Sequence, residues 1–198
     1  MIDIAVARQA LGRAAIRLPD PVPDHPLTRG RRELGRGEYS IVLEADSPER
    51  VLKVISSPAD YFLYTAEDRP TGPHYPRIFA DHGTIGRAQS GYPFHLLEME
   101  KLYPLEPGSE AASMARALIE AYWKGCQQWV QLGSNMGRIA LYHMVQGQEV
   151  ASTSLHAALR GLSDFIEEYQ VLPDILNQDN IMMREDGTLV FSDPVFMG

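Results

Sequence analysis

Two polar side chains near the end of the chain have the spacing of ligands for a hard metal ion. Asn180 precedes the apolar run 181–183, and Asp193 follows the apolar run 189–191. The Asp-Gly pair in residues 184–187 favours a tight turn, so we predict a β-hairpin. Because a hairpin brings its outer ends together, we expect Asn180 and Asp193 to bind Mg²⁺ jointly with the phosphates of a nucleotide. The alternative is a surface hairpin that binds no ligand.

A second group of residues has the pattern of a phosphate-binding loop. The segment 34–42, Leu-Gly-Arg-Gly-Glu-Tyr-Ser-Ile-Val, is followed by an apolar, strand-like run that contains Lys53. Glycine lets backbone N–H groups approach phosphate oxygens, which makes Gly35, Gly37 and Ser40 candidates for this contact. Lys53 would supply a positive charge to the same phosphates. An ordinary hairpin is the alternative for the glycines alone, but an apolar strand seldom carries a lysine without a partner.

A short helix is expected over residues 58–67, with a proline at its start. Its two acidic residues, Asp60 and Glu67, are alternatives for an ion pair with Lys53, and Glu67 is slightly preferred. A solvated surface carboxylate is the alternative interpretation of each.

The remaining elements follow from the spacing of apolar residues. We expect helices over residues 3–18, from 109 through 126, around 138–145 and from Ser152 or Thr153 to Tyr169, and strands over 77–80 and 94–99 on either side of a loop at 83–91. Four prolines within residues 19–26 predict an extended linker. Cys126 is expected to be a thiol in the core.

These elements predict an α+β fold in three parts. Residues 1–26 are expected to form a helix and a proline-rich linker. Residues 27–102 are expected to form an antiparallel sheet with one helix, and residues 103–198 a helical part that includes the hairpin.

Taken in chain order, the glycine pair, Lys53, the long helix, Asn180 and Asp193 resemble the protein kinase superfamily. The resemblance implies a minimal two-lobe kinase-like fold with an abbreviated helical second lobe, and ATP and Mg²⁺ as cofactors. It also implies that the backbone around Glu100 forms the hinge that meets adenine.

Within that superfamily, the C-terminal residues look most like the small early-expressed serine/threonine kinases of lytic bacteriophages. In that group Asp-Pro, here Asp193-Pro194, replaces Asp-Phe-Gly. This resemblance implies host proteins as substrates and the host cytoplasm as the location.

One departure concerns the catalytic base. The family pattern has an Asp five residues before the metal-binding Asn, and that position here is Ile175. Asp174 lies one residue further back, so either the loop has gained a residue and Asp174 is the base, or the base is lost. The candidate catalytic residues are therefore Asp174 and Lys53.

Three functions remain open from the sequence. The first is an ATP- and Mg²⁺-dependent serine/threonine kinase, and the second is a catalytically weak pseudokinase that binds and inhibits a host factor. The third is a small-molecule phosphotransferase of the same fold. Only five residues follow Asp193, so no activation segment is expected. The surface that binds the target would then come from other parts of the chain or from a second copy in a homodimer.

Composition limits the partners. The net charge is -8, and the only basic cluster, residues 29–32, is short, which disfavours nucleic-acid binding. A single cysteine fits a reducing cytoplasm. No apolar run reaches membrane-spanning length and no signal peptide is recognised, so we expect a cytoplasmic protein without membrane contact.

Overall fold

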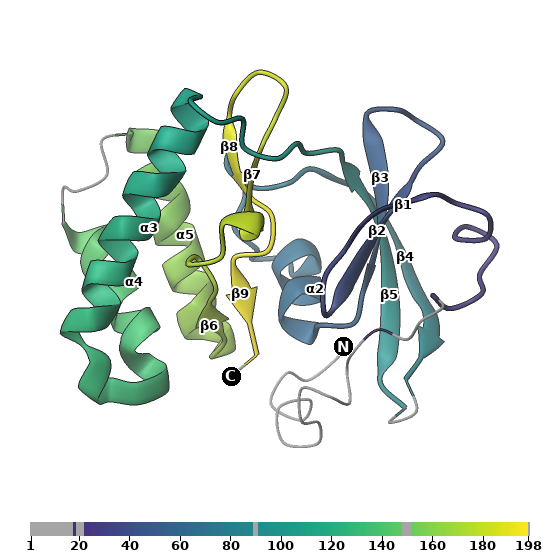
Figure 1. Cartoon of the computed structure of the whole chain (residues 1–198). Helices are drawn as coiled ribbons and strands as arrows, with labels where there is room; N and C mark the ends of the chain where they lie inside the picture. The colour runs from purple at the N-terminus through teal and green to yellow at the C-terminus, as the bar shows by residue number, and fades with distance from the viewer. Residues whose placement is uncertain (1–17, 19–21, 89–90, 148–151, 198) are drawn as a thin grey trace. The chain divides into compact units, whose positions relative to one another are not determined.

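The computed structural model describes residue 18 and residues 22–88, 91–147 and 152–197 (Figure 1). The helix predicted over residues 3–18 lies outside the described residues, apart from Leu18, and so do the first prolines of the predicted linker. Among the described residues the chain is an α+β protein with a five-stranded antiparallel sheet and four α-helices, as the sequence predicts.

The chain divides into two compact units. Among the described residues, the N-terminal unit comprises those up to Thr65, those in Arg77–Lys101 and Met197, and the C-terminal unit comprises those in Ala66–Pro76 and Leu102–Phe196. The chain therefore passes between the units more than once. The short segment Ala66–Pro76, which precedes the strands β4 (Ile78–Arg87) and β5 (Pro93–Glu100) of the sheet, already belongs to the C-terminal unit.

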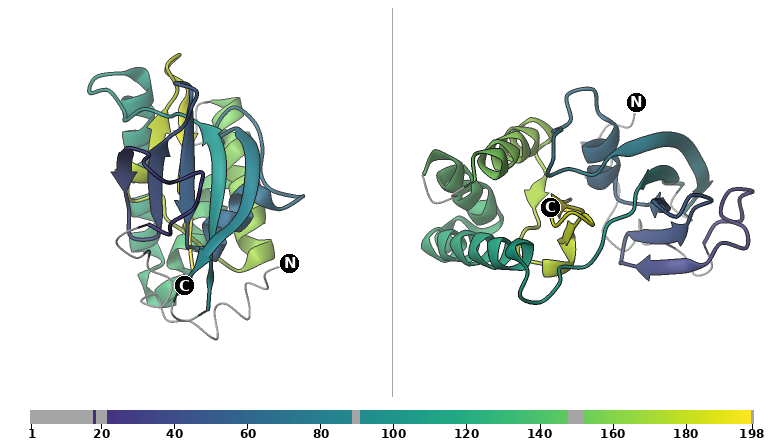
Figure 2. Two further views of the ribbon diagram at one scale, coloured as in Figure 1. Left: turned by 90° about the vertical axis from the view of Figure 1, so that its right-hand side faces the viewer. Right: turned by 90° about the horizontal axis from the view of Figure 1, so that it is seen from above.

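The sheet of the N-terminal unit has the strand order β1-β2-β3-β5-β4 and is antiparallel throughout. Its strands are β1 (Glu33–Arg36), β2 (Ser40–Glu44), β3 (Arg50–Ile55), β4 (Ile78–Arg87) and β5 (Pro93–Glu100). Neighbouring strands are twisted relative to one another (Figure 2), as the preferred handedness of extended chains requires. The central strand, β3, is buried on both faces after its first residue.

Strands were predicted at residues 77–80 and 94–99; both are confirmed, although β4 begins one residue later, at Ile78. The loop predicted over residues 83–91 is wrong, because β4 continues to Arg87. The pairing of β4 with β5 is irregular between Asp81 and Thr84, and this irregular part contains Gly83, which has φ of +71°. The Gly83 N–H donates to Asp81 Oδ1 at 2.8 Å, so the side chain of Asp81 stabilises this bulge.

One face of the sheet packs against the chain that precedes it. Leu18, Val22 and Leu27 lie against a buried cluster formed by side chains of β2, β3, β4 and β5 and by Ala45. A Cβ atom added to Gly86 would lie 2.8 Å from Pro23 Cβ, so the backbone of β4 needs a glycine at this close approach. The described part of the proline-rich segment therefore belongs to the N-terminal unit.

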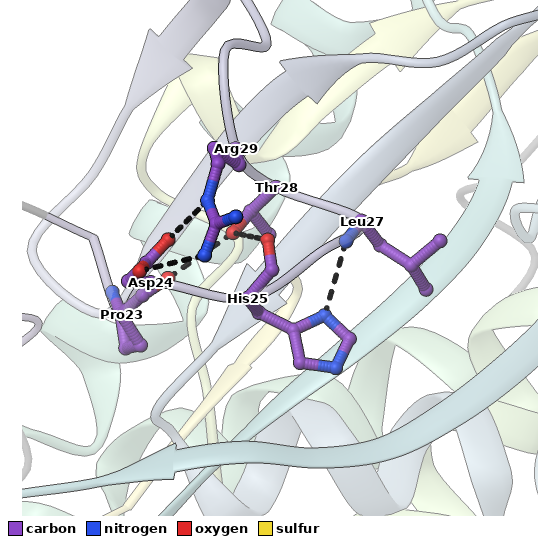
Figure 3. Close-up of polar contacts among 6 residues, drawn as sticks. All are labelled: Pro23, Asp24, His25, Leu27, Thr28 and Arg29. Carbon is purple, nitrogen blue, oxygen red and sulfur yellow. Dashed lines mark hydrogen bonds and ion pairs between the residues drawn. The ribbon is translucent and has the colours of Figure 1, made fainter.

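The turn that leads into the sheet is stabilised by local hydrogen bonds (Figure 3). Thr28 Oγ1 donates to the carbonyl oxygen of Pro23 at 3.1 Å. Arg29 donates two hydrogen bonds of 2.9 Å to the carboxylate of Asp24. The Arg29 member of the short basic cluster is thus already paired with an acidic residue.

Helix α2 (Pro58–Thr65) packs near the other face of the sheet, where its aromatic side chains meet β3 and β5. It ends two residues earlier than the predicted helix over 58–67. The ring of Tyr61 stacks on the imidazole of His95, with ring centroids 3.7 Å apart.

The C-terminal unit contains three long helices, α3 (Glu110–Gln128), α4 (Met136–Gln146) and α5 (Thr153–Tyr169). Helix α4 packs against both α3 and α5 (Figures 1 and 2). The three predicted helices of this region are confirmed, and side-chain caps at Ser109 and Ser152 begin the first and the last of them. Cys126 is buried, and burial raises the pKa of its thiol, as expected for a core residue.

Two short antiparallel strand pairs complete the C-terminal unit. Strand β6 (Leu172–Pro173) pairs with β9 (Val195–Phe196), and β7 (Ile181–Met183) pairs with β8 (Leu189–Phe191). The hairpin predicted from the sequence is therefore confirmed, and Gly187 has the positive φ of 83° that the turn requires. None of the described helices is long and apolar enough to cross a membrane.

Burial of His95 predicts a specific dependence of stability on pH. The side chain is 5% exposed, and neither ring nitrogen has a hydrogen-bond partner among the described residues. Burial lowers its pKa from 6.5 to about 4, and nearby Asp81 only partly opposes this effect. Between these values the unfolded chain binds more protons than the folded chain, so the free energy of unfolding must fall as the pH falls.

The variant His95→Phe keeps the stacking on Tyr61 and removes both nitrogens. Between pH 6.5 and pH 4, we expect the His95 effect to lower the unfolding free energy of the parent protein by about 2 kcal/mol. This loss should be absent in the variant, and urea unfolding measures it in both proteins. The matched control is His143→Phe, because His143 is exposed and also stacks on an aromatic ring, that of Trp129. An equal pH dependence in His95→Phe and the parent protein would contradict this assignment.

Candidate functional site

The predicted phosphate-binding loop is the connection between β1 and β2. Gly35 lies opposite Val42 next to an irregularity in the pairing, and the Gly37 N–H donates to the carbonyl oxygen of Ser40 at 2.8 Å. Neither glycine has a positive φ. A Cβ atom on Gly35 would meet no atom within 4 Å, and one on Gly37 would lie 3.6 Å from Ser40 Oγ. The fold therefore does not require these glycines, and their missing side chains leave space beside the hairpin.

Lys53 lies in the middle of β3 and is only 4% exposed. Its Nζ donates a hydrogen bond of 3.2 Å to the hydroxyl of Tyr64 and lies 5.0 Å from the centre of the same ring. A buried ammonium group needs such compensation, here from a hydroxyl and from an aromatic face. Tyr64 comes from α2 and was not predicted from the sequence as a partner of Lys53. The available signal was its position four residues after Asp60, on the same side of a predicted helix.

The structure distinguishes the two acidic candidates for pairing with Lys53. Asp60 is 6% exposed and lies in the first turn of α2, on the face that carries Tyr64. Glu67 is exposed and follows the end of the helix at Thr65. The slight preference for Glu67 is therefore not supported, and Asp60 is the carboxylate on the side of α2 that contacts Lys53.

Glu100 is buried at the end of β5, and its side chain serves the sheet. Its Oε1 accepts a hydrogen bond of 2.9 Å from the N–H of Arg77, whose carbonyl oxygen accepts the Glu100 N–H at 2.9 Å. The N–H groups of Lys101 and Tyr103 also donate to backbone carbonyls. The N–H of Leu102 donates to none of the described residues, which makes it the backbone group of this segment that a ligand could use.

Three predicted site residues of the C-terminal unit are brought together by backbone pairing. Asp174 follows β6, and its N–H donates to the carbonyl oxygen of Pro194 at 2.7 Å. The side-chain Nδ2 of Asn180 donates to the carbonyl oxygen of Asp174 at 3.0 Å. The Asn180 carbonyl oxygen accepts from Ser192 N at 2.8 Å and from Asp193 N at 3.4 Å. The predicted convergence of Asn180 and Asp193 is thus present in the backbone, and Asp174 joins them.

The loop between Asp174 and Asn180 ends in a tight turn. Residues Gln178–Asn180 form one turn of 3₁₀ helix, and Asn177 Oδ1 accepts a hydrogen bond of 3.1 Å from the N–H of Asp179. Ile175, at the position where the kinase pattern expects the catalytic Asp, is fully buried in the apolar core. The backbone of Asp174 nevertheless lies next to the side chain of Asn180, because its carbonyl oxygen accepts the hydrogen bond from Asn180 Nδ2.

The donor set fits a hard cation only if other ligands are added. No group of three or more His, Cys, Asp and Glu side chains that could hold a metal occurs in the described part of the chain. Asn180 and Asp193 offer an amide oxygen and a carboxylate, which are ligands that Mg²⁺ accepts together with phosphate oxygens and water. These two residues could thus hold Mg²⁺ as part of a nucleotide complex.

The hydrogen bond from Asn180 to Asp174 predicts the effect of an almost isosteric change. Asn180→Asp replaces the donor Nδ2 by an oxygen that faces the Asp174 carbonyl, so the free energy of unfolding should fall by about 1–3 kcal/mol. Urea unfolding without added metal measures this change. The control Asn135→Asp alters an exposed side chain that makes no capping hydrogen bond to α4, and it should change stability by less than about 0.5 kcal/mol. Similar effects of the two changes would show that this hydrogen bond is unimportant.

Comparison with known proteins gives no family for this chain. Neither the protein-family models nor the curated proteins with which it was compared give a match. The function is therefore inferred from the residues and their contacts.

Proposed function

We propose that the protein is an ATP- and Mg²⁺-dependent serine/threonine protein kinase with a minimal two-lobe, kinase-like fold. The N-terminal unit would be the sheet lobe, and the C-terminal unit the abbreviated helical lobe. The observation that carries the proposal is the hydrogen-bonded connection of Asp174, Asn180 and Asp193. Phosphoryl transfer needs a carboxylate near the substrate hydroxyl and oxygen ligands for the metal ion, and these hydrogen bonds bring the backbones of the three residues that carry such groups close together.

Each residue has a role in this proposal that matches its environment. Lys53, held by the Tyr64 hydroxyl, neutralises phosphate charge, and the open space beside Gly35 admits phosphate oxygens to the backbone. The Leu102 N–H provides a donor for a base such as adenine. Asp174 accepts the proton of the attacking hydroxyl. Asn180 and Asp193 would hold Mg²⁺, which would supply positive charge next to the transferred phosphoryl group.

The proposed substrates are serine or threonine side chains of host proteins. This part of the proposal rests on the resemblance of the segment around Asp193-Pro194 to the kinases of lytic bacteriophages. The corresponding location is the cytoplasm of the host cell.

A second candidate function is a pseudokinase that binds and inhibits a host factor. The observation that favours it is the contact between Asp174 and Asn180, which uses the backbone carbonyl of Asp174. If the extra residue in the loop turns the carboxylate away from the substrate, nucleotide binding would persist without efficient transfer.

The first prediction from this proposal concerns Gly35→Ala. The new methyl group has room in the protein, so the unfolding midpoint should not fall. It would occupy the space proposed for phosphate oxygens, and the affinity for Mg²⁺-ATP should drop about tenfold, or about 1.4 kcal/mol. Isothermal titration calorimetry measures the affinity. Unchanged affinity in Gly35→Ala would remove the glycine hairpin from the proposed nucleotide contacts.

The second prediction concerns the base. With γ-labelled ATP, Mg²⁺ and a bacterial lysate, Asp174→Asn should lower phosphoryl transfer at least about 100-fold while nucleotide affinity stays close to that of the parent protein. The matched control is Asp179→Asn, because Asp179 is an exposed carboxylate in the same loop and should not affect transfer.

In this assay the parent protein gives the full rate of transfer, and Asp193→Ala gives the background. Transfer by the parent protein that does not exceed the Asp193→Ala background would contradict the kinase proposal. Nucleotide binding retained under those conditions would favour the pseudokinase.

A further inference from the structure

A buried histidine outside the residues discussed so far connects an exposed serine to the hairpin. His74 is 5% exposed. Its Nε2 lies 3.0 Å from Oγ of Ser154, and its Nδ1 lies 2.7 Å from the carbonyl oxygen of Leu189 in β8. All three residues belong to the C-terminal unit.

The carbonyl contact determines which ring nitrogen carries the proton. A carbonyl oxygen can only accept a hydrogen bond, so Nδ1 of His74 must be protonated in order to donate to Leu189. In the neutral ring, Nε2 then presents a lone pair, and the hydroxyl of Ser154 donates to it. Ser154 thus has a base within hydrogen-bond distance, and a third group fixes the orientation of that base. This arrangement is the one that activated serine nucleophiles require.

Ser154 is accessible to reagents from solution. Its residue is exposed, and it lies in the first turn of α5, next to the capping residue Ser152. The two hydroxyl oxygens lie 3.0 Å apart, so Ser152 can donate to Ser154 Oγ while Ser154 donates to the imidazole. The positive end of the α5 dipole favours negative charge at this position.

We propose that Ser154 is a nucleophile and His74 its general base, and that the pair accepts groups from electrophilic phosphorus(V) esters and anhydrides. The Ser154 oxygen attacks phosphorus, so that a P–O bond forms and the bond from phosphorus to the leaving group breaks. The leaving group departs with its electron pair. The hydroxyl proton moves to Nε2 of His74, and the imidazolium ion keeps its hydrogen bond to Leu189.

The chemistry around Ser154 favours phosphoryl over acyl groups. A phosphoserine product carries negative charge, which would lie beside the imidazolium ion of His74 and near the N-terminus of α5. An acyl ester on Ser154 is neutral and would gain neither interaction.

The test is covalent labelling of the full chain with acetyl phosphate, a mixed anhydride from which acetate departs when the serine oxygen attacks phosphorus. It needs no nucleotide, so its outcome is independent of the proposed kinase activity. Peptide mass spectrometry should find the label on Ser154, with little at Ser113, an exposed serine in the first turn of α3 that contacts a backbone carbonyl. Absence of label at Ser154, or equal rates at the two serines, would overturn the proposal.

A substitution tests the role of the base. In His74→Asn the side-chain amide can still donate to the Leu189 carbonyl, but no atom remains at the place of Nε2. Labelling of Ser154 should slow about 100-fold, while circular dichroism shows a folded chain. An unchanged rate in the folded variant would overturn the role of His74.

If His74→Asn does not fold, the pH dependence of labelling in the parent protein decides. A labelling rate that rises with pH and then reaches a plateau supports the proposal. A rate that rises without a plateau, as expected for attack by a serine ionised by hydroxide, contradicts it.

Discussion

The strand register of the C-terminal unit is the constraint on which its candidate site depends. Pairing of β7 with β8 places the residues at the two outer ends of the hairpin next to each other, and pairing of β6 with β9 does the same for Asp174 and Pro194. A shift of one residue in either pair would turn every side chain to the opposite face. Leu189 and Phe191 are buried on one face of β8 and Val190 on the other, so a shift would force apolar side chains to repack on both faces. Apolar burial therefore determines where the polar groups lie.

In the N-terminal unit, α2 compensates two buried polar side chains on one face of the sheet. Lys53 and His95 lie on neighbouring central strands, and alternate positions of these strands share a face. Tyr64 provides a hydroxyl to Lys53, and Tyr61, three residues earlier, stacks on His95. A displacement of α2 would thus disturb a positively charged group and a neutral imidazole together. The short helix α2 therefore stabilises both buried polar side chains on this face of the sheet.

The sequence predicted those features that depend on local patterns. The hairpin was predictable because an Asp-Gly turn separates two short apolar runs, and the burial of Lys53 was predictable because its strand is apolar on both sides. The caps of α3 and α5 followed from serines that precede periodic helices. In each case the deciding interaction spans only a few residues.

Other features depend on contacts that the sequence does not display. Tyr64 could be assigned to Lys53 only when the placement of α2 was known, and the length of β4 depended on a bulge at Gly83. The position of Asp174 relative to Asn180 could not be predicted either, because it depends on the pairing of β6 with β9 and on the 3₁₀ turn that ends at Asn180. His74 had no sequence signal, since its partners lie 80 and 115 residues away.

The segment Ala66–Pro76 has a consequence for the order of folding. Its contacts within the C-terminal unit reach far along the chain, because the Tyr75 hydroxyl donates to the Ala158 carbonyl and Arg184 donates to the Tyr75 carbonyl. During synthesis this segment leaves the ribosome long before its partners, so it must wait unpaired until almost the whole chain has emerged. The strands β4 and β5 follow it directly and can already complete the sheet. We therefore expect the sheet to form during translation and the C-terminal unit to fold afterwards, and no single cut in the chain would separate the two units intact.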